Sequence, residues 1–114
     1  IDHDALIDQL SQKVSAYGLT YEHFDYLAPL YVPKDSELVK TLMHVYKKLT
    51  GDDTQPQVSG GATYARTMNQ CVAFGAMLPD VQDYMHQVNE QWELTSMFKA
   101  MDIYAEAVNE IVGE

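Results

Sequence analysis

The chain has 114 residues, 46% of them hydrophobic, which is enough for one domain with a hydrophobic core. Its 17 acidic residues outnumber 7 basic ones, and the net charge of -10 argues against binding to nucleic acid or to an anionic membrane surface. No apolar run approaches the ~20 residues of a membrane span and the polar start is unlike a signal peptide, so we expect a cytoplasmic protein.

The chain begins with Ile1 rather than methionine, which suggests a segment of a longer protein. Residues 4–17 are predicted to form a helix, with Asp4 as its N-cap and Gly18 as its stop signal. Apolar residues recur there at helical spacing, at Leu6, Leu10, Val14 and Tyr17. The aromatic-rich residues 19–28 predict a strand.

Two prolines, Pro29 and Pro33, then predict an extended connector and a seam between two structural units. A second helix is predicted over residues 36–49, begun by Asp35 or Ser36 and ended by Gly51. Its buried stripe is expected to be Leu38, Leu42, Val45 and Leu49. His44 falls off this stripe and is expected at the surface.

Residues 51–61 are rich in Gly, Asp, Gln, Pro and Ser and predict a loop, with a short strand near 56–58. A helical turn at 63–68 follows, and the short apolar run 71–77 predicts a buried strand. Cys71 begins this run, which indicates a buried, inert thiol, and a lone cysteine excludes an internal disulfide.

Residues 79–91 are predicted to form a polar loop, and residues 95–111 a final helix capped by Thr95 or Ser96. The apolar positions of that helix have a period near 3.6, at Met97, Ala100, Met101, Tyr104, Val108 and Ile111. Helices alternating with strands predict an α/β fold, with helices packed on a mixed sheet.

His86 is the histidine best placed for chemistry, because it follows a predicted buried strand and has Asp83, Asn89 and Glu90 nearby. Ligands in α/β folds gather where loops leave strand ends. A lone histidine in a loop is more often a surface residue, and no paired metal-ligand spacing occurs in the chain. Any metal at His86 would need ligands from elsewhere.

The turn Ser59-Gly60-Gly61 is the second candidate, because paired glycines let backbone approach a ligand closely. Free amides at the start of the following helical turn would favour an anion such as a carboxylate. Arg66, in that turn, could bind the same carboxylate. The ordinary alternatives are a plain tight turn and a surface ion pair.

Three runs occur in a fixed order, residues 59–66 (SGGATYAR), 71–77 (CVAFGAM) and 85–90 (MHQVNE). In this order they resemble the bacterial Xaa-His dipeptidases, the carnosine-splitting type of dinuclear zinc peptidase related to aminoacylases and succinyl-diaminopimelate desuccinylases. Residues 29–33 (PLYVP) and 103–107 (IYAEA) fit the same family. The resemblance covers nearly the whole chain and implies the C-terminal part of a two-domain enzyme. Residues 1–28 would end its lid domain, and residues 29–114 would complete its catalytic domain.

The resemblance also implies a chemistry. His86 matches the metal-ligating histidine of the family's H-x-x-N-E motif, while Gly60 and Gly61 match backbone that lines the substrate site. The other ligands of two zinc ions, and the general base, would lie outside this segment, so no catalytic residue is expected within it. Manganese or cobalt would suit a histidine equally well. Relatives often carry a glycine where this chain has Ala62.

The implied partners are a small peptide substrate and the remainder of the same polypeptide. The full-length protein would hydrolyse dipeptides, whereas this segment alone is expected to be inactive. Two other hypotheses about the function of the chain are open from the sequence. The acidic charge and the amphipathic helices also fit a small interaction module without catalysis. A family homologue that has lost its other metal ligands would have the same sequence here.

Overall fold

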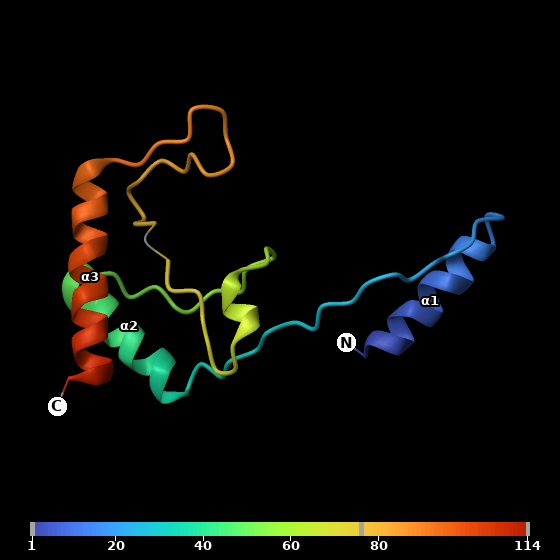
Figure 1. Cartoon of the computed structure of the whole chain (residues 1–114), viewed down its shortest axis with the longest axis horizontal. Helices are drawn as coiled ribbons and strands as arrows, with labels where there is room; N and C mark the ends of the chain where they lie inside the picture. The colour runs from blue at the N-terminus through green and yellow to red at the C-terminus, as the bar shows by residue number, and fades with distance from the viewer. Residues whose placement is uncertain (1, 76, 114) are drawn as a thin grey trace.

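The computed structural model describes residues 2–75 and 77–113, and its elements are all helical. They are α1 (His3–Ser15), α2 (Glu37–Thr50), the short 3₁₀ helix η1 (Tyr64–Thr67) and α3 (Leu94–Val112) (Figure 1). Each lies within one or two residues of a helix or helical turn that the sequence predicts. The periodic spacing of apolar residues was therefore a sufficient signal for the three long helices.

The predicted mixed sheet is wrong, because the described residues contain no strand. The segments 19–28, 56–58 and 71–77 have irregular backbone instead, with Ala76 outside the described residues. A strand is stable only when another strand satisfies its backbone hydrogen bonds, and here none of the three segments is paired with another. An apolar run shows that a segment tends to be buried, but it does not supply the neighbouring strand.

Helix α2 begins and ends at residues that the sequence identifies. The Ser36 hydroxyl accepts a hydrogen bond from the Val39 amide at 3.4 Å, which confirms one of the two predicted N-caps. Gly51 has a φ of 74° and its N–H donates to the carbonyl of Lys47 at 2.9 Å. Glycine adopts this left-handed conformation without steric cost, which is why the helix stops there.

The starts of the other two long helices were misassigned. The N-cap of α1 is Asp2 rather than Asp4, since its Oδ1 accepts a hydrogen bond from the Ala5 amide at 3.1 Å. The N-cap of α3 is Glu93 rather than Thr95 or Ser96, and it makes no side-chain capping bond. The Ser96 hydroxyl instead donates to Glu93 Oε2 at 2.9 Å. Several residues near each helix start were capable of capping, so composition did not choose among them.

The core lies where α2 crosses α3, and Val45 at its centre is completely buried. The core cluster consists of Leu42, Val45, Leu78, Ile103 and Ala107. At the edge of this contact, Lys48 pairs with Glu106 and lies 3.6 Å from Glu110. On α2 the predicted stripe holds at Leu42 and Val45, whereas Leu49 is exposed, and His44 is exposed as expected.

The buried face of α3 differs from the predicted one. Ala100 is buried as expected, but Met101 and Val108 are more than half exposed. The side chains that pack inward are Ser96, Ala100, Ile103 and Ala107. The predicted stripe lies between this inner face and a second, exposed apolar face that includes Met101 and Val108. Both faces carry apolar residues, and a period near 3.6 alone does not show which of them is buried.

The molecule is extended rather than globular. Figure 1 shows α1 standing apart from α2 and α3 at the end of the irregular segment 19–33. The radius of gyration is 19.2 Å, against about 13 Å for a compact domain of this length. Helix α1 buries none of its residues. The predicted boundary between a lid domain and a catalytic domain, at residues 28 and 29, stays a prediction. None of the described helices is long and apolar enough to cross a membrane.

Candidate functional site

A cavity of about 530 Å³ brings together three of the four residues that the sequence singles out. Gly60, Gly61 and Arg66 all line it. Its walls come from residues 29–32, from the side of α2, from residues 56–61, from η1 and from residues 71–74. Segments separated by more than forty residues therefore meet around one space, which no local pattern in the sequence indicates.

The glycine turn is held by Ser59, whose hydroxyl accepts a hydrogen bond from the Gly61 amide at 3.2 Å. A Cβ at Gly60 would meet no atom within 4 Å, and one at Gly61 would meet only Ser59 Oγ at 3.7 Å. Neither glycine has a positive φ. The described part of the chain thus gives no steric reason for glycine at these positions, and the open backbone faces the cavity.

Arg66 is positioned by η1, which is short but well anchored. The Thr63 hydroxyl caps it by accepting from the Ala65 amide at 3.3 Å, and the Ala65 side chain is buried. Arg66 Nη2 donates to the carbonyls of Leu27 and Ala28 at 2.8 and 2.6 Å. Its Nε is buried and has no acceptor among the described residues. A buried donor without an acceptor is unusual in a folded protein. The Arg66 side chain is only partly buried, so an anion would bind the exposed part of the guanidinium rather than Nε.

Cys71 also lines the cavity, and it is half-buried rather than buried as the sequence predicts. Its neighbours Val72 and Phe74 pack against the core, so the apolar run is only partly covered. Sequence reasoning did not identify the three residues of α2 that line the cavity, which are Val39, Leu42 and Met43. Their apolar spacing indicated burial, but not that the buried side would border a cavity.

His86 lies elsewhere, in a loop formed by two successive turns. The Gln87 amide donates to the Tyr84 carbonyl at 3.3 Å, and the Glu90 amide to the Gln87 carbonyl at 3.2 Å. His86 and Asn89 occupy the third positions of these turns with φ values of 59° and 64°. Positive φ is uncommon outside glycine, although Asn and His are enriched among the exceptions.

The His86 side chain is exposed and does not line the cavity. Asp83 fixes the loop, since its Oδ1 accepts a hydrogen bond from the Met85 amide at 2.8 Å. Within residues 2–75 and 77–113, no three His, Cys, Asp or Glu side chains come close enough to hold a metal ion. His86 can offer one imidazole, but a metal centre needs three or more ligands, and the described residues do not bring that number together.

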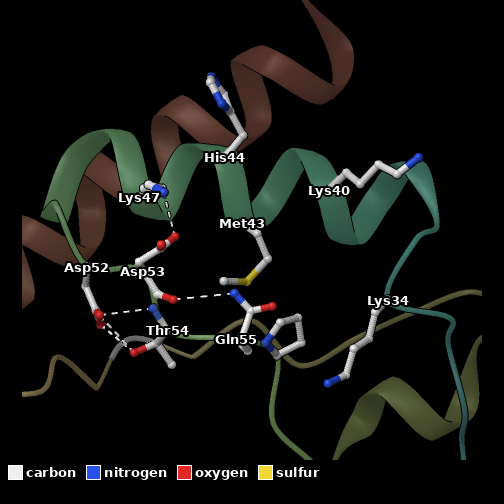
Figure 2. A pocket seen from close by; sticks show the side chains of 10 residues that line it. Lys34, Lys40, Met43, His44, Lys47, Asp52, Asp53, Thr54 and Gln55 are labelled. Atoms are coloured by element: carbon white, nitrogen blue, oxygen red, sulfur yellow. Dashed lines mark hydrogen bonds and ion pairs between the residues drawn. The ribbon is translucent and has the colours of Figure 1, made fainter.

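A second cavity, of about 320 Å³, lies between α2 and residues 52–56 (Figure 2). Its charges are largely paired, because Lys47 Nζ lies 2.6 Å from Asp53 Oδ1. Hydrogen bonds from Thr54 and then from Tyr46 hold the pKa of Asp52 below its usual value. Burial and the neighbouring Asp52 raise the pKa of Tyr46. None of the predicted site residues lies here, so the first cavity is the better candidate.

Comparison with known proteins identifies a family and several relatives of this chain. The model of Peptidase family M20/M25/M40 matches residues 5–110. A protein of Staphylococcus epidermidis named "Putative dipeptidase" is 41% identical over 102 residues, which are 90% of this chain and 22% of that protein. Similarly named proteins of Staphylococcus saprophyticus and Staphylococcus haemolyticus are 39% identical over 102 residues and 36% over 113. The chain spans less than a quarter of the length of these relatives.

Proposed function

The chain belongs to peptidase family M20/M25/M40, and on that premise we propose that it serves a metal-dependent dipeptidase, as the substrate-binding part of a longer protein. The observation that carries the proposal is the cavity in which Gly60, Gly61 and Arg66 meet. Arginine and accessible backbone amides are the groups that proteins use to bind a carboxylate. A dipeptide always presents one carboxylate at its C-terminal end.

Arg66 would hold the substrate carboxylate through the exposed part of its guanidinium, because Nη2 is already fixed by two carbonyls and Nε is buried. A guanidinium fixed in this way loses little conformational freedom when it binds a substrate. Gly60 and Gly61 would let the substrate approach their backbone, since no side chain stands in the way. The role of these three residues is therefore to bind and orient the peptide.

His86 would supply one metal ligand, with its imidazole neutral when bound. Bound metal would polarise the scissile carbonyl and make water a better nucleophile. We propose zinc, two ions to a site, with manganese and cobalt as alternatives. The other ligands and the general base belong to the part of the longer protein outside this chain. A substrate with histidine at its C-terminal position, as in Xaa-His dipeptides, is the finer form of the proposal.

The test uses a chimera in which this chain replaces the matching segment of the Staphylococcus epidermidis relative. Hydrolysis of a dipeptide such as β-alanyl-histidine is measured with and without a chelator, and bound metal is measured by mass spectrometry. We expect activity that the chelator abolishes. His86→Ala should lower both bound metal and turnover by at least 100-fold, because removing one of few ligands leaves the ion poorly held.

His44→Ala is the matched control, because His44 is exposed on α2 and lies outside the first cavity. It should leave activity and metal content unchanged. Full activity and metal content in the His86→Ala chimera would overturn the assignment of the ligand. A folded, metal-loaded chimera that hydrolyses no peptide would favour a homologue without catalysis.

A further inference from the structure

Helix α3 carries an apolar face that nothing in the described chain covers. We define this outer face as Leu94, Phe98, Met101, Ala105, Val108 and Val112. Successive members are separated alternately by four and three residues, so they form one continuous stripe along the helix. Their side chains are exposed, with Leu94 at 63%, Val108 at 59% and Val112 at 71%.

The outer face lies beside the inner face that packs on α2. The inner residues Ser96, Ala100, Ile103 and Ala107 follow the same spacing of four and three, displaced around the helix. Charged and amide side chains are confined to the remaining side, at Lys99, Asp102, Glu106, Asn109 and Glu110. A helix that covers one surface needs an apolar stripe of about 100°, and α3 has two such stripes. This pattern is typical of a helix buried on more than one side.

The face is too extensive for ordinary surface scatter. Single exposed apolar residues are common on soluble proteins, but contiguous apolar patches mark packing or binding surfaces. The stripe runs the whole length of α3, from Leu94 to Val112, without a charged interruption. Phe98, a large aromatic residue that is 58% exposed, lies within it.

We propose that the outer face of α3 packs against the part of the same polypeptide that corresponds to the remainder of the dipeptidase relatives. More than three quarters of each relative lies outside its match to this chain, which is ample to cover a helix of 19 residues. A second copy is a poorer occupant, because this length is under the three to four heptads of a self-associating coiled coil. The proposal rests on family membership and stands or falls independently of the proposed activity.

The test measures thiol labelling in the chimera at two adjacent positions of α3. Val108→Cys places a thiol on the outer face, and Asn109→Cys places one on the polar side. Both substitutions are small, and mass spectrometry of the digested protein reads each position separately. We expect Val108→Cys to react at least 10-fold more slowly in the native chimera than in urea, whereas Asn109→Cys reacts at similar rates in both. Equal labelling of the two native proteins would overturn the proposal.

Oxidation of a native residue gives a second measurement that needs no substitution. Met101, 56% exposed in this chain, should be oxidised by hydrogen peroxide at least 10-fold more slowly in the unsubstituted chimera than in the 114-residue chain. Equal rates would contradict the proposal. Sedimentation over a range of concentrations tests the alternative, which is that a second copy of the chain covers the outer face. Protection of Met101 that disappears as a dimer dissociates would assign the face to that second copy and overturn the proposal.

Discussion

Val45→Ala tests whether the contact between α2 and α3 is the core of this chain. Val45 has no exposed surface and is surrounded by the core cluster. The substitution removes two methyl groups, each contributing about 0.8 kcal/mol when buried, and the unfilled space costs a further ~0.5–1 kcal/mol. Alanine favours the helix by about 0.5 kcal/mol over valine, so the net loss should be about 1.5–2 kcal/mol.

Val108→Ala is the matched control, because it makes the same change in a helix at a side chain that is 59% exposed. Less than half of the burial energy is lost there, and the gain in helix propensity offsets it to within about 0.5 kcal/mol of zero. Urea unfolding of the 114-residue chain, followed by far-ultraviolet circular dichroism, measures both. Equal destabilisation by the two substitutions would refute the assignment of the core.

Other substitutions test the turns and the cavity. Gly51→Ala should destabilise the chain by about 1–2 kcal/mol in urea unfolding, because its φ is 74°, whereas Gly60→Ala, with no atom within 4 Å of the new Cβ, should not. Asp52 has a pKa lowered in the folded chain, so the stability it contributes is present above about pH 4 and lost as the pH falls through the folded-state pKa. Asp52→Asn should remove that part of the acid dependence; an unchanged profile would contradict it. Arg66→Lys in the chimera should raise KM for dipeptides about 10-fold or more with little change in metal content, since lysine lacks the planar fork; an unchanged KM would remove Arg66 from the site.

The sequence predicted the helices well because helix formation is largely a local property. Apolar spacing located all three long helices, and Ser36 and Gly51 marked the ends of α2 correctly. The strand predictions were wrong for the opposite reason, since a strand at 71–77 depends on a partner strand that can come from anywhere in a chain. The resemblance to a dipeptidase came from residue order in three runs, and the family match over residues 5–110 confirms the peptidase family.

The sequence by itself determined where helices form, which residues end α2 and to which family the chain belongs, because these depend on neighbours along the chain or on residue identity. Only the tertiary structure decided which apolar face of α3 meets α2, and that Gly60, Gly61 and Arg66 border one cavity while His86 lies outside it. Those are contacts between distant segments, and the energy of such a contact depends on both partners at once.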